Sequence, residues 1–233
     1  MRPWRGRTVR ALVLLLCVLC LPKVLGFPAA AQIQVHRSVQ TNTMKIALTF
    51  DDGPHPSLTG EILDILDAHG VKATFFMVGI NVFHYPEAAR EVIKRGHEVG
   101  NHTFSHPHVP RMSKEALERE LEACEDVLEE LCEYRPHLFR PPQGVLNSFV
   151  ESCAERGDYG LVLWSLDTRD WECKDAERIV EEVLSRVQPG DIILMHDYVG
   201  VQSRTPEALR MLLPKLLERG FEPTTVSDLL GMQ

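Results

Sequence analysis

The sequence has no apolar run long enough to cross a lipid bilayer. Its longest, Ala11–Leu21, has 11 residues, whereas a membrane-spanning helix needs about 17–25. Four arginines precede this run and small residues follow it at 29–31, which is the pattern of a cleaved secretory signal. We therefore expect removal of residues 1–31, no membrane span in the remainder, and export to the periplasm, the cell envelope or the medium. An uncleaved anchor is the alternative.

Positive charge is also scarce. The chain has 25 Lys and Arg against 33 Asp and Glu, for a formal charge of −8. Five of the basic residues and none of the acidic ones lie in residues 1–31, so removal of that segment lowers the formal charge to −13. Binding to a phosphate backbone depends on clustered Lys and Arg. The charge balance therefore argues against a nucleic-acid partner.

Cysteine is the third scarce residue. Two of the six lie in the apolar leader, which leaves Cys124, Cys132, Cys153 and Cys173. Their spacing resembles no zinc ribbon, although an exported protein can form disulfides. Cys124 and Cys132 are predicted to share one helix, where eight residues separate them by about 12 Å, too far for one disulfide. Each of the four therefore either pairs elsewhere or stays reduced.

The chain contains no internal repeat and no low-complexity tract. Short apolar runs alternate with amphipathic stretches, which predicts alternating strands and helices. Strands are expected at residues 45–50, 72–78, 97–99, 137–139, 161–164, 191–195 and 221–226. Helices are expected at residues 60–69, 86–95, from an N-cap at 113 to about 131, and at 146–156, 176–187 and 206–219.

This alternation is typical of right-handed βαβ units around a parallel sheet. About seven strands favour closure into a barrel over an open sheet. The expected fold is a single α/β domain over residues 44–233, preceded by a polar lead-in at residues 32–43. We expect this domain to be a monomer.

Polar side chains follow five of the predicted strands at the points where these strands end. They are Asp51, Asp52, His102, His106, Arg140, Asp167, Asp170 and His196. The carboxyl ends of the strands of a parallel barrel share one face, where active sites are built from different loops. Five separate stretches of the chain would thus meet in one pocket.

Two of these stretches predict a metal site. His102 and His106 are four residues apart, one helical turn, so both imidazoles could reach one cation, and Asp51 or Asp52 could add a carboxylate. Three protein ligands leave room for water and substrate, as in catalytic sites. The second aspartate would then be free to take a proton from the bound water. The alternative is that residues 51–54 form a simple turn.

Five segments of the chain resemble, in order, the five motifs of the polysaccharide deacetylases. This family is also called carbohydrate esterase family 4, and its members share the nodulation-type chitooligosaccharide deacetylase homology domain. The segments are Thr49–Pro54, His102–His106, Arg140–Gly144, Asp167–Trp171 and Leu194–His196. Together they cover nearly all of the chain from residue 45 onwards. The resemblance implies a distorted (β/α) barrel, a divalent ion of the zinc type with cobalt as an alternative, and removal of acetyl groups from a glycan.

The resemblance also implies roles for the metal-site and acid–base residues. Asp51 would be the general base, held by Arg140, and the ligands would be Asp52, His102 and His106. His196 would be the general acid that protonates the leaving amine. Asp170 would orient His196 and raise its pKa.

Three further residues concern the substrate. The third motif usually has an aromatic residue where this sequence has Gln143, so the shape of a sugar subsite is expected to differ while the backbone N–H still stabilises the oxyanion. Trp171 is either a wall of the cleft or a packing residue, and Leu194 either contacts the acetyl methyl group or belongs to the core. Trp164 is expected to be core.

The resulting hypothesis is a metal-dependent hydrolase that releases acetate from N-acetylglucosamine-containing polysaccharide, either peptidoglycan or chitin-like oligomers. Removal of O-acetyl groups from acetylxylan is one alternative. A glycan-binding protein on a catalytically inactive scaffold and an amidohydrolase of small cyclic amides on a related barrel are the others.

Overall fold

The computed structural model describes Met1 and residues 33–198 and 203–232. Apart from Met1, the expected signal segment lies outside the described residues. Among the residues that are described, no helix combines the length and the apolar character that crossing a membrane requires.

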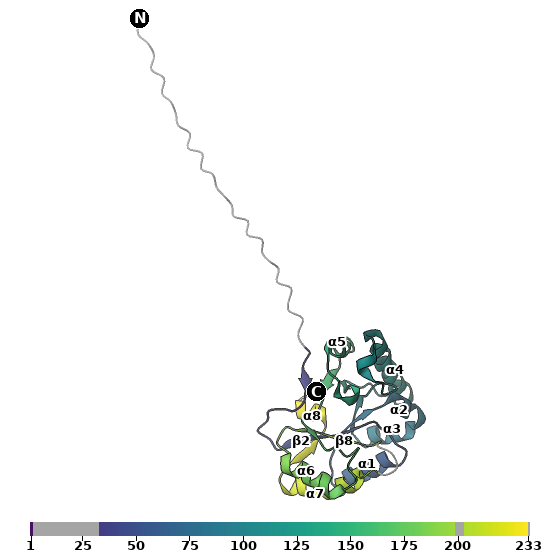
Figure 1. Ribbon diagram of the computed structural model, residues 1–233, viewed down its shortest axis with the longest axis vertical. Coiled ribbons are helices and arrows are strands. Elements are labelled where there is room, and N and C mark those ends of the chain that lie inside the picture. The colour runs from purple at the N-terminus through teal and green to yellow at the C-terminus, as the bar shows by residue number, and fades with distance from the viewer. Residues whose placement is uncertain (2–32, 199–202, 233) are drawn as a thin grey trace. The chain divides into compact units, whose positions relative to one another are not determined.

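The described residues contain nine strands, which form one sheet in which all neighbouring strands are parallel (Figure 1). They are β1 (Val35–His36), β2 (Lys45–Asp51), β3 (Thr74–Met77), β4 (Glu98–Asn101), β5 (Leu138–Phe139), β6 (Gly160–Val162), β7 (Leu166–Asp167), β8 (Ile192–His196) and β9 (Glu222–Thr224). Their order is β1-β6-β5-β4-β3-β2-β8-β7, and β9 pairs with the start of β2. The seven expected strands are confirmed. β1 and β7 are additional, and because β1 comes from the expected lead-in, the sheet begins before residue 44.

The sheet curls into a distorted barrel, as expected. β6 and β7 are only three residues apart in the sequence yet lie near opposite ends of the strand order. Leu163 N–H donates to the carbonyl of His36 in the edge strand β1 (2.7 Å). Ser165 N–H donates to the carbonyl of Ile192 in β8, near the other edge (3.0 Å). Residues 163–165 therefore connect the two edges. The expected strand at residues 161–164 ends early, at Val162, because residues 163–165 bridge the two edges of the sheet.

Helices surround the sheet (Figure 1). They are α1 (Leu58–Ala68), α2 (Gly79–His84), α3 (Pro86–Lys94), α4 (Lys114–Cys132), α5 (Ser148–Arg156), α6 (Ala176–Arg186), α7 (Thr205–Glu218) and α8 (Val226–Leu230), with short 3-10 turns at Val109–Arg111 and Pro142–Gly144. Ser113 caps α4 as expected, because its hydroxyl accepts the N–H of Ala116 (3.2 Å) and so satisfies a free donor of the first turn. The sequence did not reveal α2 or α8, which have six and five residues.

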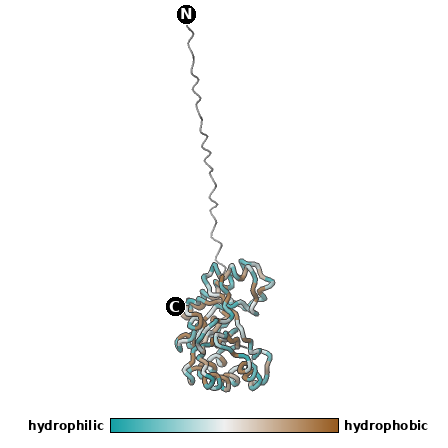
Figure 2. Tube along the Cα trace, turned by 90° about the vertical axis from the view of Figure 1, so that its left-hand side faces the viewer, coloured by the Kyte–Doolittle hydropathy of each residue, from teal (hydrophilic) through white to brown (hydrophobic). Residues whose placement is uncertain are grey.

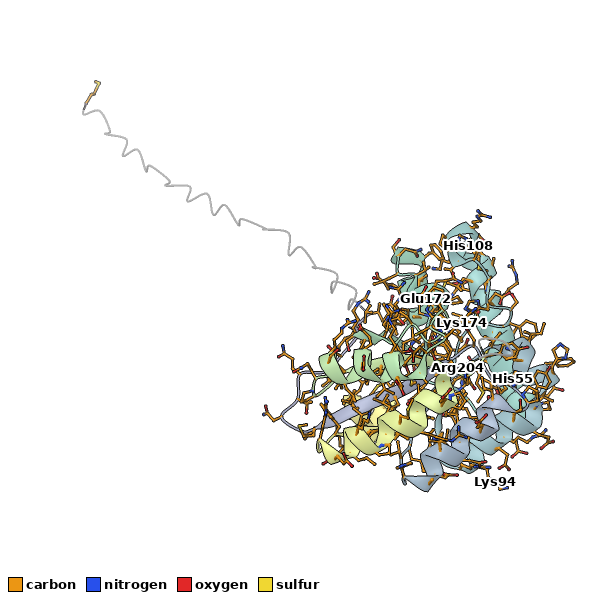
Figure 3. All side chains as sticks on the ribbon, turned by 60° about the horizontal axis from the view of Figure 1, so that its bottom comes forward. His55, Lys94, His108, Glu172, Lys174 and Arg204 are labelled. Atoms are coloured by element: carbon orange, nitrogen blue, oxygen red, sulfur yellow. The ribbon has the colours of Figure 1, made fainter. Side chains whose placement is uncertain are left out.

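The core has two layers because side chains alternate along each strand. In β2, Ile46, Leu48 and Phe50 pack with the surrounding helices, whereas Ala47 packs inside the barrel. Apolar stretches accordingly run through the interior of the domain (Figure 2). Charged side chains such as Lys94 project from the outer helices into solvent (Figure 3).

All four described cysteines are free thiols. Cys124 is fully buried on α4, and burial raises its pKa to about 12. Of the two alternatives for these residues, the structure therefore has the reduced one.

Candidate active site

Asp51 ends β2 and Asp52 begins the turn that follows. β2 and β8 pair so that Asp51 lies opposite His196, the last residue of β8. Asp52 has a φ of 76°, a left-handed conformation that costs a non-glycine residue about 1–3 kcal/mol. The side-chain amide of Asn81 donates to the carbonyl of Asp52 (2.8 Å) and so helps to hold this conformation. The two neighbouring carboxylates consequently have different partners.

The carboxylate of Asp52 contacts both histidines of the loop after β4. Its Oδ1 lies 3.4 Å from Nε2 of His102 and 3.3 Å from Nε2 of His106. The expectation that the histidines share one helical turn is wrong, because Thr103 and His106 have φ values of 68° and 52°. Asn101 Oδ1 accepts the N–H of Thr103 (2.8 Å) and supports this loop. A loop therefore brings both imidazoles onto one carboxylate.

The geometry of this cluster fits a divalent cation. Ligand atoms of a tetrahedral zinc ion, each about 2.0–2.1 Å from the metal, are about 3.4 Å apart, and both distances from Asp52 agree with this value. The three ligand atoms all lie within 4.8 Å of one another. One carboxylate with two imidazoles is a donor set of catalytic transition-metal sites. Asp52, His102 and His106 could thus hold one ion and leave positions open for water and substrate.

The surroundings of His102 prepare it as a ligand. Its Nδ1 lies 2.6 Å from the carbonyl of Arg140, so Nδ1 carries the proton and Nε2 presents its lone pair to the cluster. Burial lowers the pKa of His102, but the charges of Asp51 and Asp52 outweigh burial and leave the pKa raised. Burial and the neighbouring His102 lower the pKa of His106. Burial opposes ionisation of Asp52, yet its contacts with His102 leave its pKa lowered.

Arg140 is fully buried behind the cluster. Its Nη1 donates to Asp51 Oδ1 (2.6 Å) and to Thr49 Oγ1 (2.8 Å), and its guanidinium lies 4.0 Å from the ring centroid of Phe76. Burial lowers the pKa of Arg140, and the charge of Asp51 opposes this shift. With Oδ1 held by Arg140, Asp51 turns Oδ2 towards the cluster, 3.8 Å from Nε2 of His102.

His196 is held by Asp170, which follows β7. The Nδ1–H of His196 donates to Asp170 Oδ1 (2.7 Å), and Asp170 Oδ2 accepts the hydroxyl of Thr205 (2.6 Å). Burial lowers the pKa of His196, but the hydrogen bond and charge of Asp170 prevail and raise the pKa to about 9. Because Nδ1 is bonded to the carboxylate, Nε2 is the nitrogen that can act in the pocket.

A pocket of about 430 Å³ connects these groups. Its walls are formed by Asp51, Asp52, His102, His106, Gln143, Trp164, Asp167, Trp171, Leu194 and His196. The structure thus brings together every residue that the sequence assigned to the site. Arg140 and Asp170 are buried behind the wall and bond to residues that line it.

Some wall residues differ from expectation. Trp164 is not core but half-buried in the wall, because the chain leaves β6 before it. Its ring packs so closely on Gly144 that a Cβ there would overlap it. Trp171 is 54% exposed and belongs to the cleft, whereas Leu194 is both a buried strand residue and a wall residue. Asp167, expected just after the strand at residues 161–164, instead ends the additional short strand β7 and lines the pocket there.

Asp197 is a buried carboxyl group that sequence reasoning missed. It directly follows His196, is 1% exposed, and its Oδ2 accepts the hydroxyl of Thr59 (2.6 Å). Burial raises its pKa to about 7. The available signal was an acidic residue immediately after an apolar strand, in a segment already singled out for its histidine.

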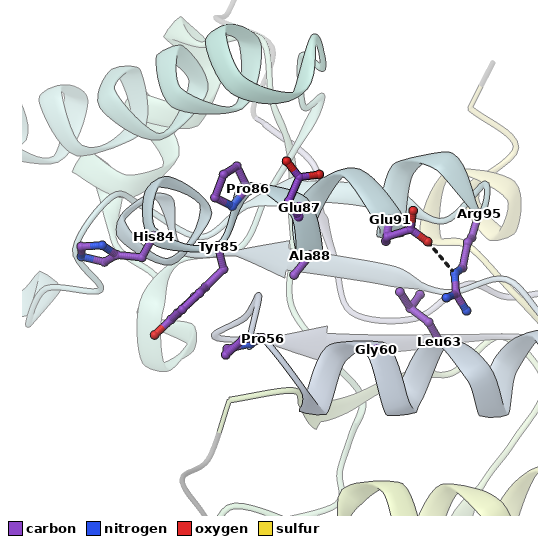
Figure 4. A pocket seen from close by; sticks show the side chains of 10 residues that line it. All are labelled: Pro56, Gly60, Leu63, His84, Tyr85, Pro86, Glu87, Ala88, Glu91 and Arg95. Carbon is purple, nitrogen blue, oxygen red and sulfur yellow. Dashed lines mark hydrogen bonds and ion pairs between the residues drawn. The ribbon is translucent and has the colours of Figure 1, made fainter.

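A second hollow of about 400 Å³ lies outside the barrel between α1 and the α2–α3 segment (Figure 4). Pro56, Leu63 and Tyr85 contribute to its walls, and at one end Arg95 Nε pairs with Glu91 (3.2 Å). Within the described residues, the single group of three potential metal ligands is the one formed by Asp52, His102 and His106. The barrel pocket is therefore the better candidate for an active site.

Comparison with known proteins shows the family of this chain. A family model described as polysaccharide deacetylase matches residues 38–162. A peptidoglycan-N-acetylglucosamine deacetylase of Bacillus cereus is 41% identical over 194 residues, which cover 82% of this chain and 91% of that protein. A chitooligosaccharide deacetylase of Azorhizobium caulinodans is 36% identical over 196 residues, which cover 78% of this chain and 93% of that protein.

Two solved structures are similar over most of the chain. One is a peptidoglycan N-acetylglucosamine deacetylase, with a TM-score of 0.80 and 34% identity, and the match covers 84% of this chain and 92% of that one. The other is a carbohydrate esterase family 4 pseudoenzyme from Bacillus anthracis, with a TM-score of 0.80 and 29% identity, covering 85% of this chain and 69% of that one. The same fold thus occurs in an enzyme and in a pseudoenzyme, so the side chains in the pocket must decide between the two.

Proposed function

Because the chain belongs to the polysaccharide deacetylase family, we propose that it removes acetyl groups from N-acetylglucosamine units of peptidoglycan or of a chitin-like glycan. The observation that carries this proposal is the presence of the Asp52–His102–His106 cluster, Asp51 and His196 in one pocket. Hydrolysis of an amide needs a base for water, an electrophile at the carbonyl and an acid for the departing nitrogen. The pocket contains a candidate for the base, for the electrophile and for the acid.

The first part of the proposal is that Asp52, His102 and His106 hold a divalent ion, zinc in the first place and cobalt as the alternative. The spacing of their ligand atoms and the mixed oxygen and nitrogen donors support it. Bound there, the ion supplies Lewis acidity towards the amide carbonyl and lowers the pKa of water.

The second part assigns the attack on the acetyl group. Asp51 takes a proton from water while the water oxygen forms a bond to the acetyl carbonyl carbon. Arg140 binds the other carboxylate oxygen (2.6 Å) and so keeps Asp51 in place, and the backbone N–H of Gln143 stabilises the oxyanion.

The third part assigns the departure of the amine. His196 donates the proton on Nε2 to the nitrogen as the C–N bond breaks, which yields acetate and a free amino sugar. Asp170 holds the imidazole and raises its pKa to about 9, so His196 carries its proton at neutral pH. One water molecule is consumed for each acetyl group removed.

The walls of the pocket support a sugar substrate. Trp171 and Trp164 offer aromatic surface, and Leu194 offers a small apolar surface for the acetyl methyl group. Ligand pockets combine such apolar walls with a few placed polar groups. The polar residues Gln143 and Asp167 at the same wall are the candidates for recognition of sugar hydroxyls.

We further propose that the enzyme is exported and acts on the cell wall or on extracellular glycan as a monomer. The signal-like pattern in residues 1–31 and the peptidoglycan substrate named for a relative support this location. A glycan-binding protein on an inactive scaffold is disfavoured because the pocket retains Asp51, Asp52 and His196 along with both histidine ligands. O-Deacetylation of acetylxylan uses the same groups and is the alternative for the substrate.

Acetate release from purified peptidoglycan, chitooligosaccharides and acetylxylan tests the proposal. We expect release from one of the two N-acetylated glycans and little from acetylxylan. Asp51→Asn is the matched control, because it keeps the shape of the pocket but removes the base. Release from acetylxylan alone would point to the ester substrate, and binding without release from any of the three would point to the inactive scaffold.

A further inference from the structure

The side chain of Asp197 packs against the turn that carries Asp52. The backbone N–H of Asp197 donates to the carbonyl of Asp51 (3.1 Å) and adds one more bond to the pairing of β2 with β8. Its carboxylate accepts the hydroxyl of Thr59 (2.6 Å), at the start of α1. Asp197 therefore connects the end of β8 with both ends of the segment between β2 and α1.

The carboxylate of Asp197 occupies the place where a side chain at residue 53 would lie. A Cβ built on Gly53 overlaps the carboxylate of Asp197, so this carboxylate packs directly against the backbone of Gly53. The φ of Gly53 is not in the left-handed region. The excluded volume of Asp197, and not the backbone conformation, is thus the reason for glycine at this position.

The strained conformation of Asp52 needs support from its neighbours. From the side of β3, Asn81 donates to the Asp52 carbonyl (2.8 Å) and the N–H of Val78 donates to the Gly53 carbonyl (2.8 Å). From the side of β8, the N–H of Asp197 donates to the Asp51 carbonyl (3.1 Å), and its carboxylate packs against Gly53. A turn held from both sides keeps its φ of 76° at Asp52, and this φ separates the carboxylate of Asp52 from that of Asp51.

We propose that Asp197 is a positioning residue for the metal site: it holds the peptide of Gly53 so that the Asp52 carboxylate stays on His102 and His106. The proposal rests on the function proposed above. Asp197 does not line the pocket and acts through Gly53 and Asp52. Because it directly follows His196, it also links the proposed general acid to the turn that bears the metal ligand.

The affinity for zinc tests this role without an activity measurement. Competition between the protein and a chromophoric chelator gives the zinc dissociation constant. We expect Asp197→Ala to raise this constant by about 10–100-fold, the usual effect of removing a residue that supports a metal ligand. Asp197→Asn, which keeps the shape and an acceptor for Thr59, is expected to stay close to wild type.

Thr74→Val is the matched control for a general loss of stability. The Thr74 hydroxyl donates to Glu98 (2.7 Å) and accepts the N–H of Val226 (2.8 Å), at the start of β3 and hence at the opposite end of the barrel from the pocket. Thr74→Val and Asp197→Ala should both lower the melting temperature. Only Asp197→Ala should weaken zinc binding.

Gly53→Ala provides an independent test of the contact. It should weaken zinc binding by itself, because the new methyl group displaces Asp197. Added to Asp197→Ala, which opens the space, it should cause little further loss, so the two effects should not multiply. Should Asp197→Ala not fold, Gly53→Ala and Thr59→Val carry the same test.

The outcomes separate this inference from the function on which it rests. A wild-type protein that binds no zinc contradicts the proposed metal site itself. A wild-type protein that binds zinc, with Asp197→Ala or its substitutes binding equally well, contradicts the positioning role alone. Independent, multiplying effects of Gly53→Ala and Asp197→Ala also contradict it.

Discussion

Asp170 binds His196 twice, through one oxygen to the imidazole Nδ1 (2.7 Å) and through the other to the backbone N–H (2.8 Å). One buried carboxylate therefore sets both the orientation of the ring and the position of the last residue of β8. The same contact accounts for the pKa of His196, which lies at about 9 although burial lowers it.

The pH profile of Asp170→Asn tests this contact. His196 donates its proton only in the charged form, so the rate should fall as the pH rises through its pKa. Removal of the Asp170 charge lowers that pKa, and the alkaline limb of kcat/KM should move to lower pH. Asp167 belongs to the same motif but makes no bond to His196, so Asp167→Asn should leave the limb in place. An unmoved limb in Asp170→Asn would show that another group titrates there.

Substrates with different leaving groups test the role of His196. His196→Ala should slow amide hydrolysis by about 10²–10⁴-fold, the usual contribution of a positioned general acid. An aryl acetate with an activated leaving group needs no proton and should lose much less. Equal losses with the amide and the ester would assign His196 to the oxyanion or to water instead.

Metal content separates the neighbouring aspartates. Asp52 lies 3.4 and 3.3 Å from the two histidines, whereas Asp51 binds Arg140. Asp52→Ala should therefore lose both metal and activity, while Asp51→Asn should keep the metal and lose activity. Elemental analysis of both variants measures this. The opposite result would exchange the two roles.

Acid should destabilise the fold through His97, which is 4% exposed and directly precedes β4, at the end of that strand away from the pocket. Its Nδ1 accepts the N–H of Ala73 (3.2 Å). Burial, together with the charge of Lys72, lowers its pKa to about 4. Because the unfolded chain binds the proton with a pKa of about 6.5, the stability from neutral His97 is present above pH 6.5 and is lost as the pH falls towards 4.

Denaturant unfolding at pH 7 and pH 4.5 measures this loss. Wild type should lose roughly 2 kcal/mol more than His97→Asn, whose amide oxygen can accept the Ala73 N–H but does not titrate. The comparison between the two proteins removes the contribution of the carboxylates, which is common to both. An equal loss in wild type and variant would contradict the assignment.

Much of the fold was predictable because most strands of the sheet coincide with a separate apolar run in the sequence. β2 is seven residues long and almost entirely buried, and a continuous apolar run of this length favours a buried strand over a helix. β1 and β7 have two residues each and do not form separate apolar runs, because β1 lies in the polar lead-in and β7 closely follows β6. Their pairing comes from closure of the barrel, which depends on tertiary contacts.

Site residues, too, could be predicted only where a local sequence pattern marks them. Asp51, Asp52 and His196 were predictable because they end long apolar strands and fall within recognisable motifs. Trp164 lies in the wall because residues 163–165 bridge the two edges of the sheet. Asp197 is buried because it packs against Gly53. Both contacts form only in the folded chain. The left-handed loop between His102 and His106 was likewise hidden, since the four-residue spacing suggests a helix.

The most direct test of the central claim measures acetate release from an N-acetylglucosamine oligomer or peptidoglycan. One preparation is measured before chelation, after chelation and after return of zinc. The account predicts release before chelation, loss of release when the metal is removed, and recovery with zinc. Undiminished release by protein that elemental analysis shows to be free of metal would contradict it.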